Sequence, residues 1–182
     1  MDNTQQTFRS IAVKTAVVHS VTYFLIGLLA FLILDYRHRF ADPNVRILMR
    51  QTDSPWVAAG PLFQPLRGLL FALAFYPLRK VLFGERSGWR AMWLLLVIVG
   101  VLSTFGPAPG SVEGMIYTTV PISFQLIGLP EVLLQSLLLS VILCHWVNHP
   151  EKKWLSWVLG VLFALALLFS GLGALMPRPG SV

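Results

Sequence analysis

The sequence predicts an all-α fold, a polytopic integral membrane helix bundle of about five transmembrane helices in which residues 1–182 form a single transmembrane domain. Hydrophobic residues make up 55% of the chain and charged residues only 12%, about half the charge of a soluble domain. Several apolar runs reach the roughly 20 residues that a helix needs to cross a bilayer core. The single cysteine, Cys144, excludes an intrachain disulfide framework and paired-cysteine zinc or redox motifs.

Each expected helix ends at a recognisable signal. The first run ends where Asp35 opens a charged segment, and the second ends at the basic residues that begin with Arg79. The third is closed by the Gly- and Pro-rich segment 106–110. Pro130 is expected in the first turn of the fourth helix, where proline is favoured, and the fifth helix stops before Pro177. The five expected helices cover about residues 15–34, 57–78, 89–105, 130–147 and 153–175.

Residues 107–129 are expected to form a partly ordered outer loop. They are moderately apolar, but polar residues and Pro121 interrupt any helical period. Three forms remain open: a surface loop, an interfacial helix and a re-entrant segment. In the re-entrant form, other helices would have to bury the irregular backbone, because lipid offers no hydrogen-bond partners.

The distribution of basic residues predicts the orientation. No Lys or Arg occurs between Ala91 and Pro150, so the loop after the third helix is expected outside the cytoplasm. This places the N-terminus in the cytoplasm and the C-terminus outside, in a bacterial inner (plasma) membrane. Loop 35–56 departs from the rule, because it is expected outside and yet contains Arg37, Arg39, Arg46 and Arg50. In an alternative four-helix topology, the second run is re-entrant and loop 35–56 returns to the cytoplasm. The basic residues that anchor the later helices would then conflict with the rule.

Arg67 is the most informative single residue, because it interrupts the second apolar run. An arginine at the centre of a transmembrane helix costs about 2.5–3.5 kcal/mol on insertion scales, so it usually faces protein, water or a counter-ion. Gln64 lies one turn away on the same helix face, and Pro61 and Pro65 are expected to kink the segment. Arg67 is expected either to form a structural ion pair or snorkel to the outer interface, which we favour, or to contact an anionic ligand.

Glu113 and Glu131 fall on the expected outer side together with Arg46 and Arg50. Carboxylates beside guanidinium groups can form an acid–base site or a proton path. No nucleophile motif accompanies them, so we expect ion pairs between these glutamates and Arg67 or the outer arginines that dock the loop.

Three histidines form a weaker pattern. His145 and His149 are four residues apart and share a helix face, and His19 is expected at the same membrane depth. Three imidazoles could ligate a metal or a haem. No accompanying ligand motif is present, so we favour structural or interfacial roles and expect no cofactor.

The expected function is non-enzymatic: an accessory, scaffold or ligand-binding subunit of a membrane complex, whose outer face is built from residues 35–56 and 107–129. Two alternatives remain. One is a small oligomeric transporter or channel for an anionic or amphiphilic solute that uses Arg67, and the other is a membrane enzyme acting on lipid or quinone. The expected partners are the lipid bilayer and a second membrane protein or another copy of the chain. Nucleic acid is not expected, because no basic soluble domain is present.

Overall fold

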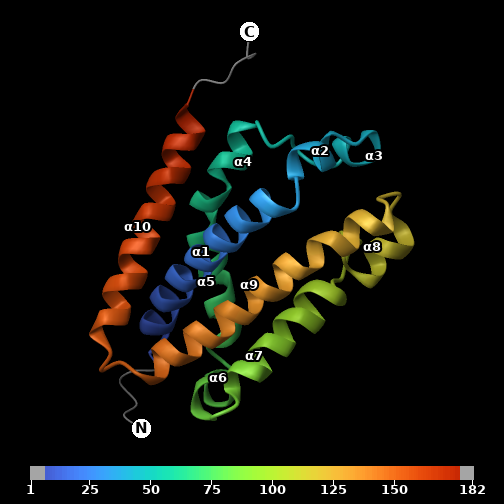
Figure 1. The fold of residues 1–182 in the computed structure, drawn as a ribbon. Coiled ribbons are helices and arrows are strands. Elements are labelled where there is room, and N and C mark those ends of the chain that lie inside the picture. Colours follow the sequence, from blue (N-terminus) through green and yellow to red (C-terminus); the bar gives the residue numbers. More distant parts are fainter. Residues whose placement is uncertain (1–6, 177–182) are drawn as a thin grey trace.

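In the computed structural model, which describes residues 7–176, the chain crosses the bundle five times in alternating directions (Figure 1). Four of these segments are long and apolar enough to span a membrane, and the α7–η3 segment is a shorter apolar helix. The expected all-α bundle of about five helices is therefore confirmed, and the chain is a helical membrane protein. The five segments are α1 (Phe8–Ile33), the continuous α4 (Pro55–Ala59), η2 (Gly60–Phe63) and α5 (Gln64–Phe75), α7 (Gly88–Val97) with the π-helical turn η3 (Ile98–Leu102), α9 (Ile122–Asn148) and α10 (Lys153–Leu175).

The helix bounds agree with the sequence for α10 and differ most for α9. The structure starts α9 at Ile122, whereas the sequence predicted a start near residue 130. Pro130 therefore lies inside the helix, and part of the expected loop 107–129 forms the first turns of α9. Transmembrane helices tolerate interior proline, because neighbouring groups satisfy the backbone that proline leaves free. Helix α1 begins at Phe8, before the expected residue 15, because the Thr7 side chain caps it by accepting a hydrogen bond from the Ser10 amide.

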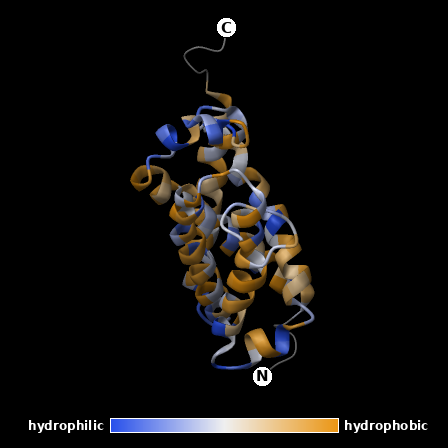
Figure 2. Ribbon diagram, turned by 90° about the vertical axis from the view of Figure 1, so that its right-hand side faces the viewer, coloured by the Kyte–Doolittle hydropathy of each residue, from blue (hydrophilic) through white to orange (hydrophobic). Residues whose placement is uncertain are grey.

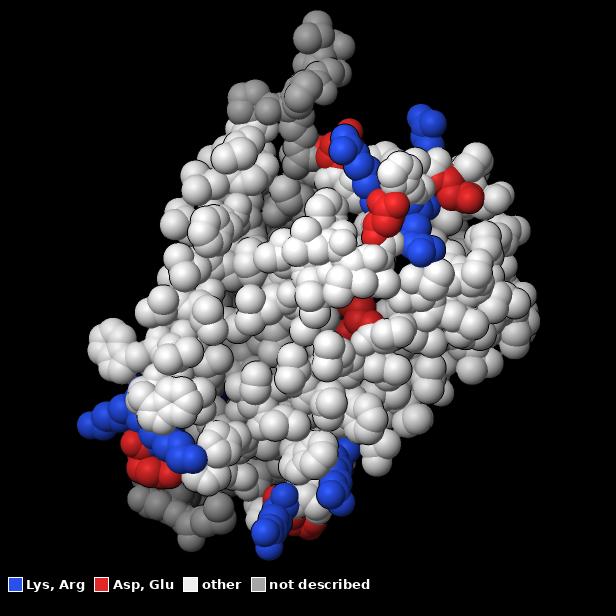
Figure 3. Space-filling model, in the orientation of Figure 1, with Lys and Arg blue, Asp and Glu red and all other residues white. Residues whose placement is uncertain are grey.

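Short helices and turns close the two ends of the bundle. Helices α2 (Tyr36–Ala41), α3 (Pro43–Arg46) and α8 (Val112–Tyr117) lie at one end, and α6 (Arg79–Gly84) lies at the other (Figure 1). Charged side chains gather at both ends, and the broad surface between them is uncharged except for one small acidic patch (Figure 3). We call the end with α2, α3 and α8 the loop end, and the end with α6 the basic end. Charged residues of the loop end are Asp35, Arg37, Arg39, Asp42, Arg46, Arg50, Asp53 and Glu113, and those of the basic end are Arg9, Arg79, Lys80, Glu85, Arg86, Arg90, Glu151, Lys152 and Lys153.

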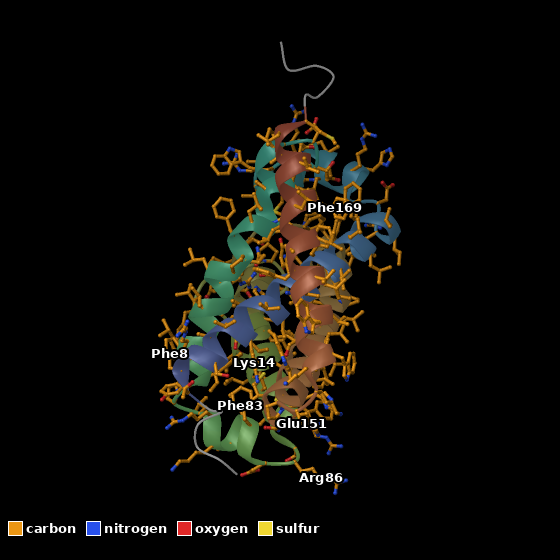
Figure 4. The ribbon with its side chains drawn as sticks, turned by 90° about the vertical axis from the view of Figure 1, so that its left-hand side faces the viewer. Phe8, Lys14, Phe83, Arg86, Glu151 and Phe169 are labelled. Atoms are coloured by element: carbon orange, nitrogen blue, oxygen red, sulfur yellow. The ribbon has the colours of Figure 1, made fainter. Side chains whose placement is uncertain are left out.

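The half of the bundle next to the basic end, which we call the closed half, contains the tightly packed core. Here α1 packs against α5, α9 and α10, and α7 packs against α9. Lys14 of α1 donates a hydrogen bond to the Trp146 carbonyl at 3.1 Å, and thereby satisfies one of the last free carbonyls of α9. Figure 4 labels Lys14 above Phe83, Arg86 and Glu151, in the lower part of the bundle. Fully buried apolar side chains of this core are Ile11, Val18, Phe75, Phe83, Met92, Leu139 and Leu143.

The other half, next to the loop end, is packed less completely, and we call it the open half. In Figure 1, α7, α8 and α9 incline away from α4 and α10 toward this end, and α2 and α3 extend across the gap. Hydrophobic residues cover most of the long helices, whereas hydrophilic residues return in the connections at the loop end (Figure 2). The chain turns from α1 into α2 at Asp35, which adopts a left-handed conformation with φ 48°. This turn directs α2 toward α9 and positions the site described next.

Candidate intramembrane binding site

The open half contains a cavity of about 790 Å³, which we call the main cavity. Helices α1, α4 and α10 supply most of its wall, and α2, η2, the segment before α4 and one residue of α9 complete it. Phe169 of α10 lies far from Arg86 and Glu151 of the basic end (Figure 4). Apolar side chains dominate the wall, among them Phe24, Leu28, Phe31, Met49, Val57 and Phe169.

Glu131 provides the one carboxylate of the main cavity. Its Oε2 atom accepts a hydrogen bond from the Tyr36 hydroxyl, the one partner that the described residues give this carboxylate. Its Oε1 atom lies beside Gly27 of α1, where a Cβ atom would be 3.8 Å from that oxygen. Burial, and then the contact with Glu131, raises the pKa of the Tyr36 hydroxyl above its ordinary value, so Tyr36 remains a donor at neutral pH. One carboxylate oxygen is therefore held by Tyr36, while the other stays available.

Arg50 provides the one cationic side chain of the main cavity. Its guanidinium lies over the Trp56 ring, 5.6 Å from the ring centroid, and both side chains are exposed. Within residues 7–176, the one ion pair joins His38 to Asp35 at 2.7 Å, and this contact holds the pKa of the exposed Asp35 carboxyl below its ordinary value. The Arg50 guanidinium therefore has no carboxylate partner in this part of the chain.

Two smaller cavities continue from the main cavity toward the middle of the bundle. The middle cavity, of about 250 Å³, shares Tyr23, Tyr36 and Glu131 with the main cavity and also reaches Arg67. The small cavity, of about 80 Å³, shares Arg67 with the middle cavity and ends at His19. Polar and charged side chains thus follow one another from the main cavity to the centre of α1.

The hydrogen bonds of Gln64 fix the tautomer of His19 at the end of this series. The Gln64 amide nitrogen donates to the Gly60 carbonyl at 3.1 Å, so its oxygen faces His19 as an acceptor. His19 Nε2 must then donate across the 3.0 Å contact. The Nδ1 atom of this buried imidazole has no partner among the described residues. Gln64 therefore points toward α1, while Arg67 is exposed beside the smaller cavities and lies over the Phe71 ring at 5.5 Å.

The segment between η3 and α9 is an ordered loop that Gln125 of α9 fastens in place. The buried Gln125 side chain accepts from the Gly110 amide at 3.2 Å and donates to the Val120 carbonyl at 2.9 Å. A Cβ atom at Gly114 would lie only 1.9 Å from the Ala108 carbonyl oxygen, so this position requires glycine. Gln125, Gly110 and Gly114 therefore stabilise the conformation of this segment. The loop contains the short helix α8 and is therefore partly ordered, as the sequence predicted.

Several residues predicted from the sequence lie away from the three cavities. Glu113 is exposed in the first turn of α8, and Arg46 is exposed at the end of α3. The expected ion pairs between glutamates and Arg67 or the outer arginines are not formed among the described residues. His145 and His149 stack at 4.2 Å near the basic end, whereas His19 contacts Gln64 and Phe71. The three histidines are therefore not brought together.

Sequence reasoning missed the two tyrosines of the site. Tyr23 follows His19 by one helical turn, a spacing that places both on one face of α1. Tyr36 lies just after the first apolar run, and only the left-handed turn at Asp35 brings it to Glu131. The first could have been found from its spacing, whereas the second depends on the tertiary path of the chain.

Comparisons of this chain with protein-family models, with curated proteins and with solved structures find no match.

Proposed function

We propose that this chain is a non-enzymatic membrane protein that binds an amphiphile, a molecule with an apolar chain and a small polar head group, in the open half of its bundle. The main cavity carries this proposal. Its volume of about 790 Å³ lies within the range of about 300–1,000 Å³ that small-molecule sites occupy. Its largely apolar wall with a few polar groups is also typical of such sites.

The proposed orientation places the basic end in the cytoplasm of a bacterial cell and the loop end outside the inner membrane. The excess of Lys and Arg around α6 and before α10 supports this orientation. Two arginines of the loop end also have local contacts that account for their position. Arg39 donates to the Leu34 carbonyl at 2.5 Å, and Arg50 lies over Trp56. With this orientation, the main cavity lies in the outer leaflet.

The filled core of the closed half supports binding over conduction. The series of cavities ends at His19, and the buried side chains of Phe75, Met92 and Leu143 fill the bundle toward the basic end. A transporter remains the second candidate, because Arg67 lines both smaller cavities as that function requires. An enzyme acting on lipid or quinone has less support, since Glu113 lies on α8 and lines none of the three cavities.

A second membrane protein, or another copy of this chain, is the proposed partner. Apolar side chains exposed on α8 (Val112, Ile116 and Tyr117) support a role for the loop end in such a contact, although headgroup lipid would also cover them.

A matched pair of tryptophan substitutions on α1 tests the proposed binding. Leu28 lines the main cavity and is 48% exposed, whereas Leu29 is 45% exposed and lines none of the three cavities. We expect Leu28→Trp to lower the occupancy of a co-purified amphiphile severalfold, because the indole fills the cavity, and Leu29→Trp to leave it unchanged. Native mass spectrometry of protein extracted from its membrane measures the occupancy. Wild-type protein that carries no amphiphile, or equal occupancy in both variants, would contradict the proposal.

A further inference from the structure

We propose that the bound amphiphile has a zwitterionic head group, with a protonated amine placed against Glu131 and an anionic group such as a phosphate placed against Arg50. This inference rests on the proposed function and specifies its ligand. An aminophospholipid, with its ammonium, phosphate and acyl chains, has the required chemistry.

The main cavity presents one negative and one positive side chain, and they do not neutralise each other. Glu131 and Arg50 are the two charged residues of its lining, and no ion pair joins them. A cavity with one charge would select a ligand of the opposite charge. Two separated charges of opposite sign are complementary to a ligand that carries both.

The carboxylate of Glu131 has unused acceptor capacity at the cavity. The Tyr36 hydroxyl supplies one donor to Oε2, whereas an ionised carboxylate offers about four acceptor positions. Oε1 lies beside Gly27, which leaves space where a larger residue would project. Tyr23 also lines this cavity, and its hydroxyl, which lies near the lining residue Gly60, offers a further acceptor. A primary ammonium has three N–H donors and matches this group of acceptors, whereas a quaternary ammonium has none.

The two charges are expected to contribute unequally. Arg50 is exposed at the loop end and rests on Trp56, so water can solvate its guanidinium in the empty protein. Glu131 is half-buried in the third turn of α9, where an unpaired carboxylate is costly. The ammonium contact with Glu131 should therefore decide selectivity, and the phosphate contact with Arg50 should add affinity that does not depend on the amine.

Three lipids that share acyl chains and phosphate separate these contributions. Purified protein in detergent is offered equal amounts of phosphatidylethanolamine, phosphatidylcholine and phosphatidylglycerol, and native mass spectrometry measures the bound fraction of each. We expect wild-type protein to retain phosphatidylethanolamine over each of the other two by about tenfold, the ratio that one charge-assisted hydrogen bond supports.

Two conservative variants, each with a matched control, assign the selectivity to residues. Glu131→Gln keeps the size of the side chain and the contact with Tyr36, and it should bring the ethanolamine-to-choline ratio close to one. Arg50→Gln should weaken both lipids together and leave that ratio unchanged. The same substitutions at the exposed residues Glu113 and Arg46 should leave wild-type binding unchanged.

Each outcome supports or overturns the inference. An ethanolamine-to-choline ratio near one in wild-type protein, or an unchanged ratio in Glu131→Gln, overturns it. A preference for phosphatidylglycerol refutes the proposed amine contact with Glu131 and indicates an anionic ligand instead. If lipid is bound in any of these cases, the proposed amphiphile binding still holds. Wild-type protein that binds no lipid refutes both the amphiphile binding and the zwitterionic head group. Since the wild-type ratio is itself an expected result, the inference can be refuted even if a variant does not fold.

Discussion

The closed and open halves of this bundle are built from the same helices, yet they fill the space between those helices differently. In the closed half, Phe75, Met92 and Leu143 are buried from α5, α7 and α9, and the buried polar side chains of this half, such as Thr15 and Ser140, are small. In the open half, Tyr36 and Glu131 meet across α2 and α9 beside a cavity of about 790 Å³. Helices in lipid gain little from burying apolar surface against one another, so close packing itself must hold them together. We infer that the closed half stabilises the bundle, whereas the open half is packed less closely and retains a cavity for a ligand.

The largest expected effect comes from removing core volume in the closed half. Leu143 is fully buried, so Leu143→Ala should lower the free energy of unfolding by about 2–5 kcal/mol, because the cavity it leaves is only partly refilled. Leu28 is 48% exposed in the open half, so the same substitution there should cost about 0.5 kcal/mol or less. Reversible unfolding in mixed micelles measures both values. Equal losses at the two positions would remove the distinction between the halves.

A smaller effect is expected where a buried amide holds the loop end together. Gln125→Leu removes the hydrogen bonds to Gly110 and Val120 and leaves their backbone groups unpaired, at a cost of about 1–3 kcal/mol. Hydrogen exchange of the amides in residues 108–118 should become faster. Gln135 lines the smaller cavities, and its side chain makes no hydrogen bond to the described residues, so Gln135→Leu is the matched control. If both variants exchange at the same rate, Gln125 does not fasten this loop.

Much of the fold could be predicted from the sequence, because apolar length determines which segments cross a membrane. The bounds of α10 were predicted correctly from its apolar run and the following Pro177. The start of α9 was predicted wrongly, because Pro130 is a strong signal for a helix start in general and a weak one inside a membrane. Local signals of this kind depend on the solvent around the helix as well as on the residue.

The candidate site was predicted only in part. Glu131, Arg50 and Arg67 were identified because charges are rare in this chain, and all three line cavities. Their expected ion pairs are not formed among the described residues, where Glu131 contacts Tyr36 and the two arginines lie over Trp56 and Phe71. Tyr36 was missed for a similar reason, since its contact with Glu131 depends on one turn at Asp35. Charge content identifies candidates, while tertiary geometry decides their partners.

An experimental structure of the wild-type protein in lipid tests the difference between the two halves most directly. We expect elongated density for one amphiphile between α1, α4 and α10, with its polar end at Glu131 and no comparable density in the closed half. A main cavity closed by α10 moving against α4, or density of equal strength in both halves, would contradict the account.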